Sequence, residues 1–217
     1  MMMPLSELLF LFWMAPVAYL IGSIPFSVWI GKFFHGIDVR EHGSGNAGAT
    51  NVMRVLGVKT GTPVLILDML KGFGAVKLIH FQQKISTGDE LFMMLSILLG
   101  TAAVLGHVFP VFAGFRGGKG VATIAGVCFS ICWQATLVAT GIFIIVVFIT
   151  RYVSLGSITA GISYPLSVIF IFQNEFITAW IFSLFVSFLI ILTHRKNIDR
   201  LIRGAENRAS FLFKQKH

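Results

Sequence analysis

The chain has 217 residues, of which 56% are hydrophobic and only 12% are charged. Soluble domains carry about 25% charged residues, so this composition argues against a water-soluble globular domain and against intrinsic disorder. The net charge of +8 is not arranged as a stripe of Lys and Arg interleaved with aromatic residues, so it indicates orientation in a membrane rather than nucleic-acid binding.

Long apolar runs predict transmembrane helices, because about 20 apolar residues are needed to cross the hydrocarbon core. The first run covers residues 8–31 and has neither a basic leader nor a small-residue cleavage site, so we expect a span rather than a signal peptide. The second covers residues 60–79 and contains Asp68 and Lys71, and the third covers residues 91–115.

The next run, residues 120–150, is free of charge over its whole length. As one helix it would be about 46 Å long, more than one crossing needs. The alternative is two short helices that turn near Trp133 and Gln134. Two further runs follow, at residues 152–174 and 176–193.

The positions of the basic residues decide between these alternatives. Two helices in the 120–150 run give seven spans, and most of the 17 Lys and Arg then fall on one face. The opposite face would hold mainly acidic residues with one clear lysine, namely Glu7, Asp89, Glu90, Glu175 and Lys84. Basic loops face the cytoplasm. We therefore predict an all-α polytopic bundle of seven transmembrane helices, with the N-terminus outside and the C-terminus in the cytoplasm.

The chain shows no convincing internal repeat, so we expect residues 1–217 to form a single transmembrane domain. Its basic end, residues 194–217, is predicted to be a cytoplasmic surface tail. Ile198, Leu201 and Ile202 give this tail a short apolar face, which predicts that it begins as a helix on the membrane surface.

Glycine and small polar residues gather at residues 43–51, ahead of Arg54. Closely spaced glycines let backbone N–H groups converge on an anion, and Ser, Asn, Thr and Arg side chains add donors. A flexible loop or a small-residue helix contact is the alternative. We favour an anion site, whose candidate residues are Ser44, Gly45, Asn46, Gly48, Thr50, Asn51 and Arg54.

A second cluster covers residues 106–110, with His107, and residues 115–120, where Lys119 lies among Gly117, Gly118 and Gly120. A helix N-terminus with free N–H groups and an adjacent Lys is a ready phosphate site. It is not a nucleotide P-loop, because Ala113 stands where that motif requires glycine. A tight turn with one snorkelling lysine is the alternative reading.

Two further segments offer polar groups at the same predicted face. Ser154 and Ser157 follow Arg151 and provide hydroxyl donors, although a plain interfacial turn fits them as well. His194 and Asn197 are three residues apart and share a helical face, for which a structural role is the alternative.

Asp68 and Lys71 are also three residues apart, inside the second predicted span. Unpaired charge at that depth is costly, so we expect them to pair with each other or to face the bundle interior. A proton or ion path in a transporter is the alternative. The two cysteines, Cys128 and Cys132, suit neither a disulfide framework nor a zinc site, so we expect buried thiols, no metal and no cofactor.

Three motifs, residues 44–51, 106–123 and 194–201, occur together and in order. With them the sequence resembles the bacterial integral-membrane glycerol-3-phosphate acyltransferases that use acyl phosphate as donor. The resemblance extends through residues 22–26, 67–72 and 151–155. Thr193 and Asp199 depart from it, since the family usually has basic residues at both positions.

The resemblance implies transfer of a fatty acyl group from acyl phosphate to the 1-hydroxyl of glycerol 3-phosphate. The products would be 1-acylglycerol 3-phosphate, or lysophosphatidate, and inorganic phosphate, with neither acyl-CoA nor acyl-carrier protein as donor. It also implies a multi-pass protein of the bacterial plasma membrane, whose active site faces the cytoplasm. The expected partners are acyl phosphate, glycerol 3-phosphate and the lipid bilayer, without nucleic acid, and we expect a monomer.

These inferences give a hypothesis for the site. Ser44, Asn46, Thr50 and backbone N–H groups would hold the acyl-phosphate group. Glycerol 3-phosphate would be held by the residues that remain, Arg54, Lys119, either Ser154 or Ser157, His194 and Asn197. The proton acceptor is either His194 or the substrate phosphate, and nearby cations favour the phosphate. A transporter for a phosphorylated anion is the rival class of function.

Overall fold

The computed structural model describes residues 5–82, 86 and 88–213, with the side chains of residues 6–8 and 11 left aside. Every regular element in these residues is helical, which confirms the all-α prediction. The helices are α1 (Leu5–Ser23), α2 (Phe26–His35), α3 (Ala49–Leu56), α4 (Val58–Lys77), α5 (Glu90–Val108), α6 (Val121–Ile131), α7 (Trp133–Thr150), α8 (Val153–Leu166), α9 (Ile177–Thr193) and α10 (Arg195–Ile202). Short 3-10 helices cover Val39–Glu41, Leu78–Phe81, Val111–Ala113 and Ser210–Leu212, and a π-helix, Ser167–Ile171, extends α8.

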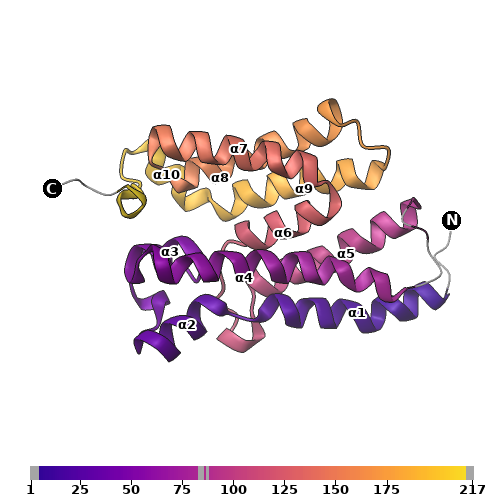
Figure 1. Cartoon of the computed structure of the whole chain (residues 1–217), viewed down its shortest axis with the longest axis horizontal. Coiled ribbons are helices and arrows are strands. Elements are labelled where there is room, and N and C mark those ends of the chain that lie inside the picture. Colours follow the sequence, from indigo (N-terminus) through magenta and orange to yellow (C-terminus); the bar gives the residue numbers. More distant parts are fainter. Residues whose placement is uncertain (1–4, 83–85, 87, 214–217) are drawn as a thin grey trace.

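The long helices form two groups that lie side by side (Figure 1). One group contains α1, α4 and α5, and the other contains α7, α8 and α9. The short helix α6 joins them, packing on α4 and also contacting α7 and α9. α3 and α10 lie near the same end of the molecule, although they come from opposite ends of the chain.

The run at residues 8–31, predicted as one span, is interrupted at Pro25 between α1 and α2. Phe12–His35 still qualifies as one candidate membrane span. Proline has no backbone N–H and its ring clashes with the preceding turn, which accounts for the break. α2 then ends at Gly36, whose φ of +70° is a left-handed conformation that glycine adopts without strain.

The run at residues 120–150 forms two helices, as predicted, with the break at Cys132, directly before Trp133. α6 has 11 residues, so it is only about 16 Å long and extends through about half of a hydrocarbon core. Both cysteines of this run are buried and free, as expected.

Fewer helices than the seven predicted spans meet the length and composition of a full crossing. Among the described residues there are four such segments, Phe12–His35, Glu90–Ala113, Trp133–Thr150 and Val153–Ile171. A fifth is reached if α9 and α10, which meet at a 60° bend, count as one span. Lys84, the Glu7 side chain and residues 214–217 of the tail, which entered the orientation argument, lie outside the description.

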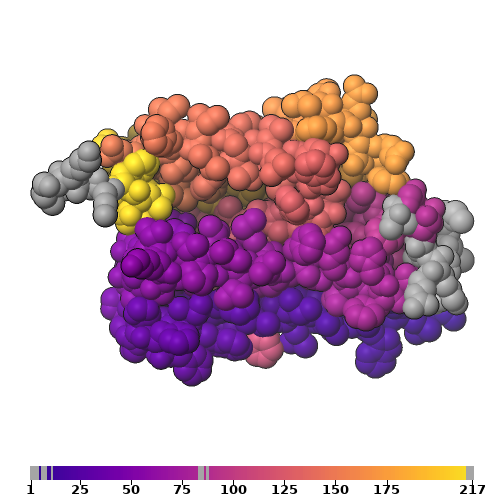
Figure 2. Space-filling view, viewed as in Figure 1, coloured from indigo at the N-terminus to yellow at the C-terminus, as the bar shows by residue number. Residues whose placement is uncertain are grey.

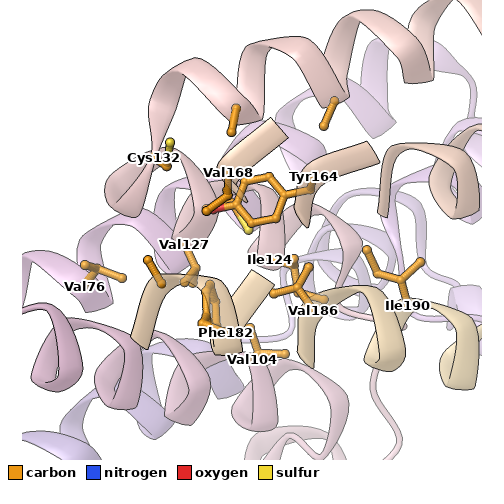
Figure 3. Packing of buried hydrophobic residues seen from close by; sticks show 14 of the residues in the cluster. Val76, Val104, Ile124, Val127, Cys132, Tyr164, Val168, Phe182, Val186 and Ile190 are labelled. Carbon is orange, nitrogen blue, oxygen red and sulfur yellow. The ribbon is translucent and has the colours of Figure 1, made fainter. Parts of the chain in front are cut away.

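A core of apolar side chains packs where α6, α8 and α9 meet (Figure 3). Ile124 and Val127 of α6 face Tyr164 of α8 and Phe182 and Val186 of α9. Small residues let α6 approach α4 closely on its other side. A Cβ at Gly126 would lie 1.9 Å from the carbonyl oxygen of Met69, so only glycine fits there. This contact fixes α6 beside the middle of α4.

Candidate active site

A cavity of about 550 Å³ lies between the two groups of helices. The surface is hollowed between α7 and the α3–α4 pair (Figure 2). Every residue that the sequence singled out as a site candidate lines this one cavity, namely Ser44, Gly45, Asn46, Gly48, Thr50, Asn51, Arg54, His107, Gly117, Gly118, Lys119, Gly120, Ser154, Ser157, His194 and Asn197. Residues far apart in the chain are thus brought together.

The loop before α3, residues 43–48, is the first of two loops at the cavity, and the side chain of Asn51 holds it in place. Its Oδ1 accepts hydrogen bonds from the Ser44 backbone N–H at 2.8 Å and from the Ser44 hydroxyl at 3.1 Å. Its Nδ2 donates to the carbonyl oxygens of Val39 and His42, at 2.7 and 3.0 Å. The Asn51 amide is therefore occupied in shaping the loop, whereas we expected it to bind substrate.

Gly48 caps α3, so the N–H groups of Ala49 and Thr50 at its start have no intrahelical acceptor, and both residues line the cavity. The N–H of Asn51 already donates to the Gly48 carbonyl at 3.0 Å. Arg54 lies in the last turn of α3 and is half-buried. Its guanidinium lies 5.6 Å from the centre of the Phe211 ring, and burial lowers the pKa of Arg54 from its usual value. The usual pKa of arginine lies so far above neutral pH that the group remains a cation.

The second loop of the cavity, residues 114–120, precedes α6, and its glycines allow other segments of the chain to approach closely. A Cβ at Gly117 would lie 2.0 Å from the carbonyl oxygen of His107, and one at Gly118 would lie 2.3 Å from Nε2 of His107. Gly120 has a φ of +80° and caps α6. Gly117 and Gly118 are thus required for packing, in addition to any contact with an anion.

Lys119 points from this loop toward the chain's C-terminal segment, where its ammonium donates a hydrogen bond to Oδ1 of Asn197. Burial lowers the pKa of Lys119 to about 8, with Glu206 acting in the opposite direction and Arg200 and Arg54 lowering it further. Because neutral pH lies close to this pKa, an anion that binds beside Lys119 would stabilise the charged form of its side chain.

Glu206 connects the groups around Lys119. Its Oε1 accepts hydrogen bonds from Ser154 Oγ at 2.8 Å and from Asn197 Nδ2 at 2.7 Å, and its Oε2 pairs with Arg200 Nε at 2.7 Å. Burial alone would raise the pKa of Glu206, but the hydrogen bonds from Arg200, Asn197 and Ser154 lower it. The carboxylate therefore stays ionised and fixes the positions of its donors.

Glu206 and Arg200 both line the cavity, and sequence reasoning missed them as site residues. The signal for Glu206 was an acidic residue in a mainly basic tail, where Asp199 is the other one. The two serines left open by the sequence differ in the structure. Ser154 bonds to Glu206, whereas Ser157 donates to the carbonyl oxygen of Val153 within its own helix at 2.9 Å.

His194 follows the last residue of α9 and is 2% exposed. Its Nδ1 lies 2.8 Å from the carbonyl oxygen of Ile190. A carbonyl only accepts, so this contact assigns the proton to Nδ1 and leaves Nε2 as an acceptor. Burial, and after it the nearby Lys119 ammonium, lowers the pKa of His194 to about 4. The ring is therefore neutral at physiological pH.

The cavity continues from these polar groups into an apolar limb between the helices. Its walls come from α4, α6, α7, α8 and α9, and include Leu65, Ile124, Phe143, Tyr164 and Val186. The polar end carries Arg54, Lys119 and Arg200 around the carboxylate of Glu206, so positive charge exceeds negative charge there. This arrangement fits a molecule with a phosphate at one end and a long apolar chain at the other.

Asp68 and Lys71 form an ion pair of 2.8 Å in α4, with side chains 2% and 3% exposed, as the sequence predicted. Asp68 reaches the cavity wall, and so does His107. Within the described part of the chain, no three His, Cys, Asp or Glu side chains gather closely enough to hold a metal ion.

Known proteins are similar to this chain in sequence and in fold. The family model of glycerol-3-phosphate acyltransferase matches residues 12–204. A glycerol-3-phosphate acyltransferase of Chlorobaculum tepidum is 47% identical, over 90% of this chain and 94% of the relative.

Two crystal structures of PlsY (YgiH), an integral membrane glycerol 3-phosphate acyltransferase, share the fold. The glycerol 3-phosphate form is 39% identical with a TM-score of 0.82, and the lysophosphatidic acid form is 38% identical with a TM-score of 0.80. Each comparison covers 94% of this chain and 98% of the other. The cavity therefore belongs to a member of an enzyme family that resides in membranes: the chain belongs to the glycerol-3-phosphate acyltransferase family.

Proposed function

We propose that this protein transfers a fatty acyl group from acyl phosphate to the 1-hydroxyl of glycerol 3-phosphate. The products are 1-acylglycerol 3-phosphate and inorganic phosphate. The observation that carries this proposal is the single cavity that joins a cation-bearing end to an apolar limb. Both substrates bring a phosphate, and the donor also brings a long chain. The bound states named for the PlsY structures, glycerol 3-phosphate and lysophosphatidic acid, agree with it.

The two phosphates are assigned to the two loops. The Ser44 hydroxyl, Asn46, Thr50 and the free N–H groups at the start of α3 hold the phosphate of the donor. Lys119 and Arg54 hold the phosphate of glycerol 3-phosphate, since both cations line the cavity close to the C-terminal segment. The remaining polar groups, Ser154, Ser157, His194 and Asn197, complete this second pocket.

The reaction needs no covalent intermediate on the protein, because an acyl phosphate is already activated. The hydroxyl oxygen of glycerol 3-phosphate bonds to the carbonyl carbon, and the bond from that carbon to the phosphate oxygen breaks. The protein positions the reactants and stabilises the charge on the carbonyl oxygen and on the departing phosphate. The cations and N–H groups already face the cavity, so little reorganisation is needed.

A substrate phosphate, rather than His194, accepts the hydroxyl proton. With its pKa lowered by burial to about 4, His194 is a weak base. A phosphate has a second pKa of about 6, closer to the working pH. His194 then acts as a neutral hydrogen-bond acceptor, which helps to hold glycerol 3-phosphate through Nε2.

The membrane arrangement follows from the same proposal. The chain is a monomer with seven membrane segments in the bacterial plasma membrane, its N-terminus outside and its C-terminus in the cytoplasm. α4 and the short α6 complete the count beside the five longer spans that are obtained when α9 and α10 count as one. Basic residues at the cavity end, such as Arg54 and Lys119, support a cytoplasmic active site.

The experiment is an assay of the purified protein in detergent or lipid. Synthetic acyl phosphate and glycerol 3-phosphate are supplied together and separately, and lysophosphatidate and released phosphate are measured. We expect both products only when both substrates are present, and none with acyl-CoA or acyl-carrier protein as donor. Product from acyl-CoA alone as donor would contradict the proposal. Counterflow of labelled glycerol 3-phosphate into proteoliposomes without a donor would favour a transporter instead.

A further inference from the structure

Asp68 and His107 form a buried link beneath the second loop that the proposed chemistry does not use. Oδ1 of Asp68 pairs with Lys71 Nζ at 2.8 Å and lies 3.6 Å from Nδ1 of His107. Lys71 also donates to the carbonyl oxygen of Ile24, at the break between α1 and α2, at 2.9 Å. All three charged or polar side chains are at most 6% exposed.

His107 is in direct contact with the loop that carries Lys119. Its backbone carbonyl accepts a hydrogen bond from the N–H of Gly118 at 3.3 Å. A Cβ at Gly118 would lie 2.3 Å from Nε2 of the His107 ring and 2.9 Å from the carbonyl oxygen of Ala47. Gly118 is therefore held between the imidazole and the first loop.

These contacts connect the Asp68–Lys71 ion pair to the second loop through His107, and to the first loop through Gly118. The carboxylate at 3.6 Å is too far from His107 for a hydrogen bond, but because both side chains are at most 6% exposed it still attracts the Nδ1 side of the ring electrostatically. The imidazole ring packs against Gly118 and so determines its position, and Gly118 in turn lies next to Ala47. The distance between the two loops depends on the orientation of this imidazole.

We infer that Asp68 and His107 are positioning residues, which hold the Gly117–Lys119 segment against the Ser44–Gly48 loop at the spacing that two phosphates require. This inference rests on the proposed function. It changes the expected role of His107 from a substrate ligand to a support, and it gives the Asp68–Lys71 pair a role beyond satisfying buried charge.

A purely structural ion pair would behave differently when both of its charges are removed. Breaking a buried pair leaves an unpaired charge and destabilises the fold, whereas replacing both members by neutral groups is often tolerated. The test therefore uses the double variant Asp68→Asn/Lys71→Met beside Asp68→Asn alone. The matched control is Asp199→Asn/Arg203→Met, which removes an exposed pair of α10.

The measurements are the thermal midpoint in detergent and the KM and kcat for both substrates. We expect Asp68→Asn to lose thermal stability and the double variant to regain it, while kcat/KM of the double variant stays about tenfold or more below wild type. The loss should fall mainly on the KM for glycerol 3-phosphate, since Lys119 shifts with its loop. The control should match wild type in both measurements.

Recovery of wild-type kcat/KM in the stable double variant would overturn the inference, because the pair would then serve stability alone. If that variant does not fold, His107→Gln gives the same decision with the ion pair intact. We expect it to keep its thermal midpoint within a few degrees and to lose about tenfold in kcat/KM, and wild-type kinetics would overturn the inference. An inactive wild type in the same assay would instead count against the proposed function.

Discussion

Lys119 shows how the surroundings of one side chain adapt it to its task. It is a partly buried cation whose ammonium donates a hydrogen bond to Asn197. The charges of Glu206, Arg200 and Arg54 act on it as well. Burial is the largest cause of its lowered pKa, and the neighbouring carboxylate only partly offsets it. A lysine in this state is charged at neutral pH but loses its charge at a modestly alkaline pH.

This lowered pKa predicts a pH dependence of substrate binding. As pH rises above about 8, Lys119 loses its proton and its attraction for phosphate, so the KM for glycerol 3-phosphate should increase. The slope should approach about tenfold per pH unit. Lys119→Arg should keep a charge over this range and show no such increase, although its KM at neutral pH need not equal that of wild type.

The measurement is KM for wild type, Lys119→Arg and Lys59→Arg, from about one pH unit below to about two units above the Lys119 pKa of about 8. Lys59 is an exposed lysine at the start of α4 and serves as the control, so its variant should follow wild type. The same alkaline increase in Lys119→Arg as in wild type would show that another group titrates.

Among the helices, the contact of α4 with α6 requires small residues. Gly126 faces the Met69 carbonyl oxygen, and a Cβ at Gly72 would lie 2.2 Å from the carbonyl oxygen of Thr123. Inside a membrane the hydrophobic effect does not drive helices together, so they associate through close packing of this kind. It also holds the start of α6, and with it Lys119, in place against α4.

This contact predicts opposite effects of the same substitution at two helical glycines. Gly126→Ala should destabilise the protein by about 1–3 kcal/mol through overpacking, because its Cβ would meet the Met69 carbonyl at 1.9 Å. Gly141→Ala in α7 is the matched control, since nothing lies within 4 Å of its Cβ position. Alanine there should be neutral or stabilise by up to about 1 kcal/mol.

Thermal unfolding in detergent, followed by loss of activity and by aggregation, compares the two variants. We expect a clearly lower midpoint for Gly126→Ala and no decrease for Gly141→Ala. Equal midpoints would mean that the α4–α6 contact relaxes freely, and that it does not fix the start of α6.

For the whole molecule, the sequence predicts the helical class, the two-helix division of residues 120–150 and the residues of one shared cavity. Their signals are local: charge-free runs, glycine clusters and nearby cations. Pro25 is also a local signal, and it could have predicted the break between α1 and α2. The apolar run continues on both sides of it, however, and this favoured one uninterrupted helix. Glu206 was missed because its partners, Ser154, Asn197 and Arg200, meet only in the folded chain.

The same limit explains Asn51 and His107. Their residue types suit an anion site, yet folding directs Asn51 to backbone groups of its own loop and places His107 against Gly118. The number of membrane crossings is also a property of the whole. α6 is too short for a full crossing and α4 carries buried charge, so neither fits a count based on apolar length.

The central claim, that one cavity holds both phosphates at its polar end and the acyl chain in its apolar limb, is tested most directly by a structure of the protein with a non-hydrolysable acyl phosphonate and glycerol 3-phosphate. We predict the phosphonate beside Ser44 and the start of α3, glycerol 3-phosphate beside Lys119, and the chain between α6, α7 and α8 past Ile124 toward Tyr164. A chain bound on the outer surface of the bundle, or phosphorus atoms remote from Ser44 and Lys119, would contradict the account.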